Sequence, residues 1–374
     1  MQAEPELGSI QEVPARVSHA YYRTGAVYVA VAILAAALAL VIATSYRVSF
    51  SGADDSCCVS EWLINYGGGF VRRGLGGAVI LRVADLTGLS PRLIVFTILA
   101  SSYTVFFTAL AAMVWRLRKI DYLELVMVIS PFAALFPVLH RIAGQRKEIL
   151  MLALAAIAGV TGLGRLDSIA KYLCWSLLFA AIVAVHDGSI FFLPLFVIYL
   201  RVLTPPRYPM GYRALAILLP SAGIFLLGYL RSTHVDIPAI CAAMDAAAKG
   251  DWCAPQMGKG TPYAVAWLGA SALDGVRSVI RGYTDSPGPF LALLAGGIGL
   301  IPVAVALRRD AAGLRVAVAD LPFRQLFLWM SALGMAVVFC VAHDGNRWLY
   351  IITVFLTLMH FAARYNLMRT DDAA

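Results

Sequence analysis

Two adjacent arginines follow a glycine-rich turn at residues 65–77, which read Asn-Tyr-Gly-Gly-Gly-Phe-Val-Arg-Arg-Gly-Leu-Gly-Gly. An apolar pattern then continues to residue 86 and predicts a short interfacial helix, one face of which carries Val71, Leu75, Val79 and Arg82. A helix start bears partial positive charge, so arginines there are unfavourable unless an anion binds. We therefore expect Arg72 and Arg73 to bind a phosphate or diphosphate. The alternative is that both side chains reach lipid headgroups.

A second basic segment reads His-Arg-Ile-Ala-Gly-Gln-Arg-Lys-Glu at residues 140–148. It lies in a short loop that the topology given below places outside the cytoplasm, where positive charge is disfavoured. A specific negative partner would explain the placement, so the phosphate-binding candidates also include Arg141, Arg146 and Lys147. Glu148 is assigned no role, because a carboxylate suits the start of a helix.

The tripeptide His-Asp-Gly occurs twice, at residues 186–188 and 343–345, each time after an apolar segment. Glycine and histidine are ordinary at a helix C-terminus, whereas aspartate is not favoured there. We therefore interpret these side chains as general bases or arginine partners, and the catalytic candidates are His186, Asp187, His343 and Asp344. Arg347 follows the second copy and joins the phosphate-binding candidates. Plain polar turns and a divalent metal site are the alternatives, and no metal is predicted.

Three acidic residues, Asp54, Asp55 and Glu61, follow the first apolar segment. One of them could act as the base instead, because a carboxylate can accept the proton of an attacking hydroxyl. The other interpretation is a solvated rim of the loop.

Hydrophobic residues make up 60% of the 374 residues and charged residues 14%, with a mean hydropathy of +0.78. This is too apolar for a soluble domain. The apolar segments approach the ~20 residues that a helix needs to cross a ~30 Å hydrocarbon layer. The sequence predicts an all-α polytopic membrane bundle of about ten transmembrane helices, at residues 26–45, 93–115, 121–139, 149–163, 172–186, 189–203, 214–230, 289–307, 324–342 and 348–363.

Lysine and arginine are distributed unevenly over the predicted loops. With the amino terminus in the cytoplasm, 16 of the 30 fall in cytoplasmic segments and four in short outer loops, which places both termini in the cytoplasm. Residues 1–25 and 364–374 are then cytoplasmic tails, and residues 26–363 form one transmembrane domain with long periplasmic loops at about 46–92 and 231–288. The net charge of +8 fits anchoring to anionic lipid, and nucleic acid is not predicted as a partner.

Four of the six cysteines lie in the two long outer loops, on the side where disulfides persist. Cys241 and Cys253 enclose 11 intervening residues, and we expect them to be bonded. Cys57 and Cys58 are rival partners. The two remaining cysteines fall inside apolar segments and are interpreted as apolar filler.

Three segments together resemble the Wzy-type and EpsG-like polymerases of bacterial surface-polysaccharide loci. Their motifs are a Gly-Gly-Phe-Val-Arg-Arg-Gly-Leu loop, an outward Arg-Lys-Glu and an Asp-Gly-Asn-Arg-Trp turn, and the segments that contain these motifs comprise about 30 residues in all. The resemblance implies transfer of sugars carried on undecaprenyl diphosphate at the outer face of the bacterial inner membrane, in exopolysaccharide or O-antigen biosynthesis. It also implies that the diphosphate is held by Arg72, Arg73, Arg141, Arg146 and Arg347. The large loop between the seventh and eighth spans departs from typical Wzy proteins.

The chain also resembles GT-C glycosyltransferases, which carry a catalytic carboxylate in the first outer loop and an interfacial helix after it. That resemblance implies Asp54, Asp55 or Glu61 as the base and a polyprenyl-phosphate sugar as the donor. On either resemblance the partners are a polyprenyl-linked oligosaccharide, membrane lipid and, as an option, other polysaccharide-assembly proteins, with no cofactor. The competing class is a transporter or flippase of lipid-linked sugars or another anionic substrate. Transporters usually hold ionisable residues near mid-bilayer, whereas the charges here flank the apolar segments.

Overall fold

The computed structural model describes residues 24–50, 56–162, 168–204, 211–232, 235–248, 265, 268, 271–309, 324–341 and 345–371. Within these ranges the regular structure is helical. Three helices are long and apolar enough to cross a membrane, namely α1 (Thr24–Phe50), α4 (Pro91–Arg116) and α16 (Gly345–Asp371, of which residues 345–366 qualify). An 18-residue stretch of each of these helices has a mean hydropathy of 2.8, 2.0 and 1.3, respectively. The chain is therefore a helical membrane protein.

The other predicted apolar segments also coincide with helices. They correspond to α5 (Tyr122–Ile129), α6 (Phe136–Leu139), α7 (Glu148–Gly162), α8 (Ile169–Val185), η4 (Asp187–Phe192), α9 (Leu193–Leu203), α10 (Gly211–Arg231), α13 (Gly288–Arg309) and α15 (Arg324–Val341). Two of these segments differ from the expected single helix. Residues 121–139 break into α5 and α6, because Pro131 biases Ser130 towards its extended conformation (ψ 138°). Residues 189–203 begin as the 3₁₀ helix η4 and become α-helical at Leu193, next to Pro194.

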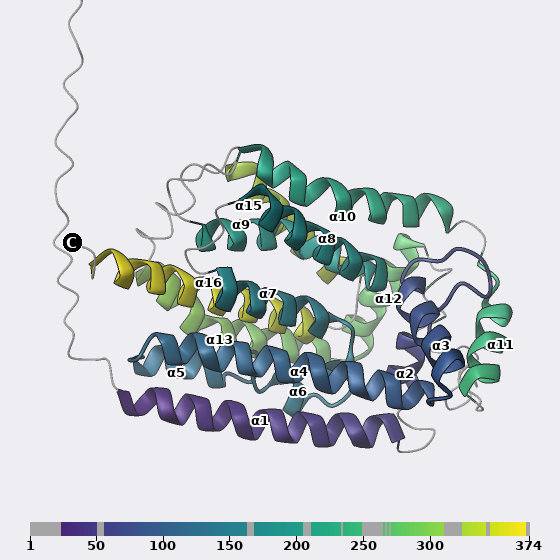
Figure 1. Cartoon of the computed structure of the whole chain (residues 1–374), viewed down its shortest axis with the longest axis horizontal. Coiled ribbons are helices and arrows are strands. Elements are labelled where there is room, and N and C mark those ends of the chain that lie inside the picture. Colours follow the sequence, from purple (N-terminus) through teal and green to yellow (C-terminus); the bar gives the residue numbers. More distant parts are fainter. Residues whose placement is uncertain are drawn as a thin grey trace, which may run out of the picture.

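The helices pack along one long axis, with α1 beside α4, α4 beside α7, α8 beside α10, and α13 beside α16 (Figure 1). Almost every side chain of α7 is buried, and many of them are small. At Gly159 a Cβ would lie 2.4 Å from the Tyr199 hydroxyl and 2.5 Å from Met113 Sδ. Small residues let helices approach closely where lipid supplies no hydrophobic drive between them. The composition of α7 thus explains its central place.

The two ends of the bundle differ in construction (Figure 1). Thr24 of α1 and Asp371 of α16 lie at one end, beyond which the chain is not described. Short helices gather towards the other end: α2 (Ser56–Trp62), α3 (Gly74–Thr87), α11 (Ile237–Ala248) and α12 (Ala272–Asp285). The segment expected to be an interfacial helix is α3, and the long loops at 46–92 and 231–288 contain helices rather than linkers. Which end faces the cytoplasm stays a prediction from the charge distribution.

Candidate anion-binding site

The glycine turn before α3 lies against the start of α11. The carbonyl of Gly68 accepts a hydrogen bond from the Asp236 N–H over 3.1 Å, and Asn65 Nδ2 donates to the Ile240 carbonyl over 3.3 Å. A Cβ on Gly68 would come within 2.0 Å of the Asp236 carbonyl oxygen. The turn therefore needs glycine because the backbone of another segment approaches it so closely.

The first turn of α3 is open in the sense that no side chain caps its N–H groups. Arg73 is its N-cap in the left-handed conformation (φ 65°, ψ 7°), no side chain caps the helix, and the first turn contains no acidic residue. The first N–H groups of a helix have no partner within it and carry partial positive charge. Gly77 fixes the position of the helix, since a Cβ there would lie 2.0 Å from the Ile64 carbonyl oxygen.

Both arginines at this helix start contact Asp187, the first residue of η4. Arg73 Nε lies 2.5 Å from Asp187 Oδ1, and Arg72 Nη1 lies 3.7 Å from Oδ2. Burial raises the pKa of the Asp187 carboxyl, but Arg73, followed by His186 and Arg72, outweighs burial and holds that pKa below its usual range. Burial lowers the pKa of Arg73, but the carboxylates of Asp187, Glu61 and Glu148 together outweigh burial and raise it. Asp187 is thus an ionised partner of the arginines.

The basic loop at residues 140–148 is fastened to three surrounding helices. The carbonyl of Gln145 accepts a hydrogen bond from Trp62 Nε1 over 3.0 Å, and its side chain accepts one from Ser45 Oγ over 2.7 Å. The Tyr103 hydroxyl donates to the Gly144 carbonyl. These contacts fix the backbone just before Arg146 and Lys147. The loop therefore presents these two cations from a rigid position.

Arg146 pairs with Glu61, and Lys147 lies at the centre of the charged residues. Burial raises the pKa of Glu61, but Arg146, together with His186 and Arg347, outweighs burial and lowers the pKa to about 2. Lys147 is 0% exposed, and its Nζ donates to the carbonyls of Val185 over 3.2 Å and Arg73 over 3.4 Å. Burial lowers the pKa of Lys147 to about 8, with the carboxylates of Glu61, Asp187 and Glu148 opposing it. A buried lysine that is hydrogen-bonded to carbonyls and forms no close ion pair among the described residues is an expensive group to keep.

Glu148, the first residue of α7, connects this region to α16. Its Oε1 lies 3.1 Å from His186 Nε2 and 3.2 Å from Arg347 Nη1, and all three side chains are buried. Neither ring nitrogen of His186 makes an aligned hydrogen bond with the described residues. The guanidinium of Arg347 also covers the Trp348 ring, 4.4 Å from its centroid. His186 is thus placed with Nε2 beside the Glu148 carboxylate, while Nδ1 has no hydrogen-bond partner among the described residues.

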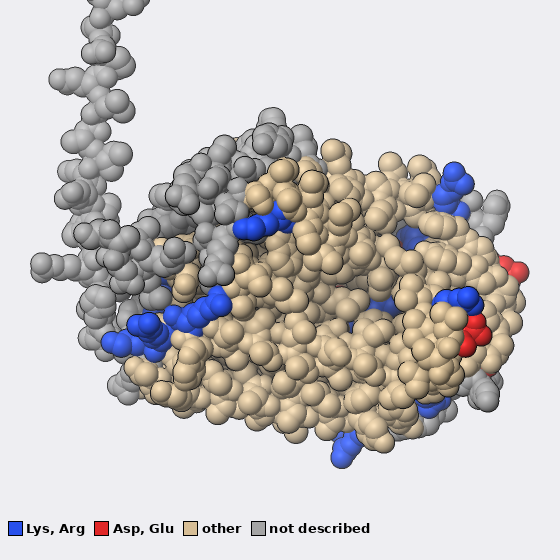
Figure 2. Space-filling view, in the orientation of Figure 1, with Lys and Arg blue, Asp and Glu red and all other residues tan. Residues whose placement is uncertain are grey.

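We call these charged residues the Lys147 cluster: Glu61, Arg72, Arg73, Arg146, Lys147, Glu148, His186, Asp187 and Arg347. Its five cationic side chains come from three segments far apart in the sequence and face three carboxylates. With His186 neutral, two positive charges are in excess among the described residues. The face shown in Figure 2 is hollowed near its middle, and basic side-chain atoms lie in the floor of the hollow. Such an excess, partly buried and next to an open helix start, favours an anion.

The structure brings together only part of the predicted site. Arg141 is exposed and forms no ion pair with the cluster among the described residues, whereas Glu148, for which no role was predicted, lies inside it. Four further candidates, Asp54, Asp55, His343 and Asp344, lie outside the described residues. Glu148 was missed because the helix dipole already explains a carboxylate at that position. Its neighbours in sequence, Arg146 and Lys147, were the available signal.

Cys241 on α11 is disulfide-bonded, while Cys174 and Cys340 are free. The side chains of the three remaining cysteines, Cys57, Cys58 and Cys253, lie outside the described ones. The pairing of Cys241 with Cys253 therefore stays a prediction.

Within the described ranges, no group of three or more His, Cys, Asp or Glu residues could hold a metal ion.

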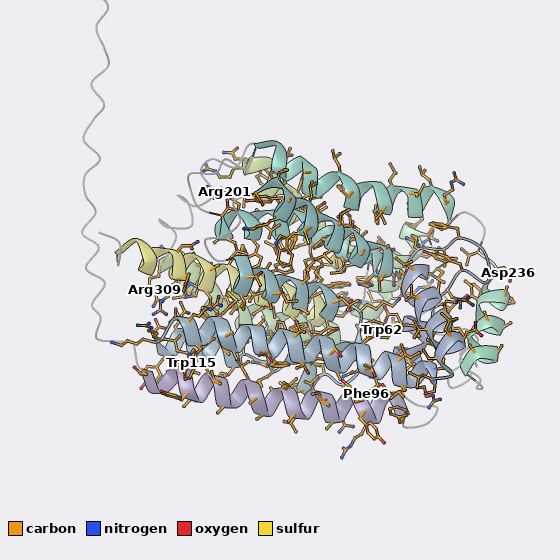
Figure 3. All side chains as sticks on the ribbon, in the orientation of Figure 1. Trp62, Phe96, Trp115, Arg201, Asp236 and Arg309 are labelled. Atoms are coloured by element: carbon orange, nitrogen blue, oxygen red, sulfur yellow. The ribbon has the colours of Figure 1, made fainter. Side chains whose placement is uncertain are left out.

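A second buried charge cluster, which the sequence analysis did not single out, lies at the opposite end of the bundle. Figure 3 labels Trp62 beside the first cluster and Arg309 in the second. Glu124 contacts Arg364 and lies 2.8 Å from His360 Nε2, Asp121 pairs with Arg309, and Arg364 Nη2 donates to the Lys119 carbonyl over 2.7 Å. We call these residues the Glu124 cluster: Asp121, Glu124, Arg309, His360 and Arg364. It ties α5, α13 and α16 together.

Comparison with known proteins found no family model, curated protein or solved structure that matches this chain.

Proposed function

We propose that the bundle crosses the membrane about ten times, with both termini in the cytoplasm and the Lys147 cluster at the periplasmic face of a bacterial inner membrane. Two observations support this orientation. Lysine and arginine are in excess in the predicted cytoplasmic segments, and two of these residues, Arg201 and Arg309, lie on the Thr24 and Asp371 side (Figure 3). The described ends of the first and last helices also share that side (Figure 1).

At this face the protein is proposed to act as a glycosyltransferase of surface-polysaccharide biosynthesis that uses polyprenyl-phosphate or polyprenyl-diphosphate sugars. The observation that carries the proposal is the convergence of five cations on three carboxylates beside the open start of α3. Arginine suits phosphate because its planar guanidinium can donate two parallel hydrogen bonds. A lipid-linked donor also needs no site for a soluble nucleotide.

In the proposed reaction, the oxygen of an acceptor sugar hydroxyl attacks the anomeric carbon of the donor sugar. The bond from that carbon to the phosphate oxygen breaks, and its electron pair leaves with the phosphate. Arg72, Arg73 and Lys147 would stabilise the developing charge, which is the largest single contribution in many enzymes. The hydroxyl proton passes to a base of the cluster, for which Asp187 and His186 are the candidates.

Asp187 would become a stronger base when the donor binds. In the free protein Arg73 and Arg72 hold its pKa low. A phosphate that takes over these guanidiniums removes the stabilisation of the carboxylate, while the burial that raises the pKa of Asp187 remains. Donor binding is thereby coupled to proton acceptance.

His186 is the second candidate for the base. Its Nε2 lies 3.1 Å from Glu148 Oε1, so the carboxylate can orient the imidazole and stabilise its protonated form. This arrangement gives Glu148 the role of a positioning residue. Asp187→Asn and His186→Gln distinguish the two candidates, because loss of the base abolishes transfer while donor binding persists.

The charge distribution favours an enzyme over a transporter or flippase. Both described buried clusters lie at ends of the bundle, around Lys147 and around Glu124, and the helices between them bury mainly apolar side chains. A transporter usually holds its substrate near mid-bilayer with ionisable residues and broken helices. The break between α5 and α6 is the feature that a transporter would explain best.

The proposal is tested by the length of surface polysaccharide in cells that carry Arg73→Gln at normal protein level. Arg82→Gln is the matched control, because Arg82 lies on the same helix α3 but is exposed and pairs with Asp85. We expect Arg73→Gln to shorten or abolish the polymer and Arg82→Gln to leave it unchanged. Unchanged polymer in both would contradict the proposed role of the cluster.

A further inference from the structure

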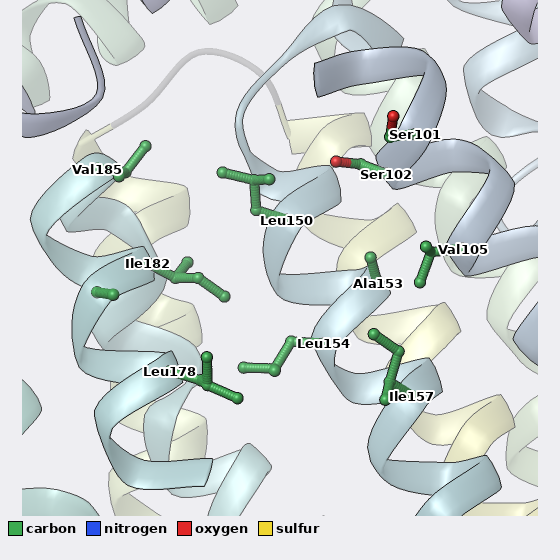
Figure 4. A pocket seen from close by; sticks show the side chains of 11 residues that line it. Ser101, Ser102, Val105, Leu150, Ala153, Leu154, Ile157, Leu178, Ile182 and Val185 are labelled. Carbon is green, nitrogen blue, oxygen red and sulfur yellow. The ribbon is translucent and has the colours of Figure 1, made fainter. Parts of the chain in front are cut away.

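An apolar groove of about 370 Å³ lies between α4, α7 and α8 (Figure 4). Its lining runs from Leu150 to Ile157 along α7 and from Leu178 to Val185 along α8, and the hydroxyls in it come from Ser101 and Ser102 of α4. Seven residue steps along a helix correspond to about 10 Å, roughly a third of a ~30 Å hydrocarbon layer. The groove therefore occupies only the part of the bundle nearest the Lys147 cluster.

The groove is open towards the outside of the bundle. Val105 and Leu178, which line it, are 37% and 44% exposed. In the proposed orientation these side chains face lipid, so a chain dissolved in the membrane can enter the groove sideways without passing through water. A hydrocarbon chain gains little from apolar contact alone here, since the surrounding lipid is equally apolar. Preference for one lipid must come from what lies at the end of the groove.

That end meets the Lys147 cluster at one residue. The Val185 side chain lines the groove, and the Val185 carbonyl accepts the hydrogen bond from Lys147 Nζ over 3.2 Å. Gly76, in the first turn of α3, borders the same point. A Cβ on it would lie 3.0 Å from Val185 Cγ1 and 3.8 Å from Lys147 Nζ. The apolar groove and the cationic site are thus adjacent, with Gly76 beside the point where they meet.

We propose that this groove binds the isoprenoid segment nearest the head group of a polyprenyl diphosphate lipid, while the diphosphate lies between Arg72, Arg73 and Lys147. The inference rests on the proposed function and names the path of the chain. Charge complementarity selects this occupant, because the cluster has two positive charges in excess and a diphosphate supplies at least two negative ones. An ordinary phospholipid, with a single phosphate, neutralises the cluster less completely.

The test is photolabelling of the protein in phosphatidylcholine vesicles with a prenyl diphosphate that carries a benzophenone on its chain. Labelled peptides are mapped by mass spectrometry, and labelling of residues 101–105, 150–157 and 178–185 is compared with that of α1. We expect the groove to be labelled about tenfold more than α1, which corresponds to about 1.4 kcal/mol. Excess inorganic pyrophosphate should remove the preference.

Two tryptophan variants of α4 serve as a matched pair. Ser101→Trp fills the groove, whereas Thr104→Trp places the same bulk at an exposed position that does not line it. We expect Ser101→Trp to lose the groove labelling and Thr104→Trp to keep it. Pyrophosphate binding, measured by calorimetry, should persist in both and shows that the variants are folded.

The outcomes separate this inference from the proposed function. In one outcome the probe labels the groove and α1 equally, while the wild-type protein still binds pyrophosphate and Arg73→Gln does not. This result would reject the groove as the isoprenoid site and leave the anion site supported. If an uncharged prenol probe or a phosphatidylglycerol probe labels the groove as strongly as the prenyl diphosphate probe does, the proposed selectivity is also rejected. The groove is then a general lipid site. Absence of pyrophosphate binding together with absence of preference overturns both proposals.

Discussion

Replacing Lys147 distinguishes most sharply whether a buried residue serves anion binding or stability. Its side chain is 0% exposed, and burial lowers its pKa from 10.5 to about 8. That lowering corresponds to about 3 kcal/mol against the charged form in the folded protein. Replacing Lys147 by methionine removes this cost but leaves the carbonyls of Val185 and Arg73 without their donor, which offsets it by about 1–2 kcal/mol.

We therefore predict that Lys147→Met makes the protein more stable by about 1–2 kcal/mol and weakens pyrophosphate binding by about one to two decades. Thermal unfolding in detergent and calorimetric titration measure the two effects on the same sample. Arg82→Met, at an exposed position of α3, should change neither. Loss of stability with unchanged pyrophosphate binding would show that Lys147 is structural and would refute the reasoning.

The sign of the pH dependence follows from the lowered pKa of Lys147. Below about pH 8 the ammonium is charged and binds the anion, and above it the charge is lost, so pyrophosphate affinity should fall as pH rises through 8. Folding stability should change in the opposite direction. Lys147 releases its proton more readily in the folded state than in the unfolded chain. The free energy of unfolding should therefore rise as pH increases from about 8 to 10.5. Lys147→Arg should bind pyrophosphate without the fall near pH 8, because arginine stays charged.

Three further predictions concern the frame around the site. Gly77→Ala should lower the unfolding temperature and weaken pyrophosphate binding, because its Cβ would lie 2.0 Å from the Ile64 carbonyl oxygen, whereas Gly297→Ala, with nothing within 4 Å, should do neither. Glu124→Gln should cost about 3–5 kcal/mol of stability, because it leaves the buried Arg364 without that carboxylate, yet pyrophosphate binding at the other end should persist. Peptide mapping of unreduced protein should find Cys241 linked to Cys253, and a Cys241 peptide linked to Cys57 or Cys58 would contradict that pairing.

Local sequence patterns predicted the helices well, because the hydrophobic segments are long and polar residues interrupt them. The boundaries of α1, α4 and α7 lie within five residues of the predicted spans, whereas α3 begins at Gly74, so the arginine pair precedes the helix instead of lying in its first turn as expected. The breaks before α6 and α9 were missed. Both depend on prolines that apolar membrane segments also tolerate within continuous helices, as α10 and α13 do.

The pairing of charges could not be predicted, because it depends on contacts between distant segments. Arg73 and Asp187 are 114 residues apart, and Glu124 and Arg364 are 240 apart. The arginines could be identified from the sequence because each violates a local rule of charge placement. Glu148 and Glu124 obey the local rules for helix starts, so only the fold shows that both are buried among cations.

The most direct test of the central proposal follows the fate of a lipid-linked sugar added to the purified protein in vesicles. A polyprenyl diphosphate oligosaccharide with a labelled sugar is supplied together with an unlabelled lipid-linked acceptor, and products are separated by chromatography. We predict a longer labelled glycan and an equal amount of free polyprenyl diphosphate, both lost in Arg73→Gln and retained in Arg82→Gln. Transfer of the intact lipid-linked sugar to the opposite leaflet, with no new glycosidic bond, would contradict the account and identify a flippase.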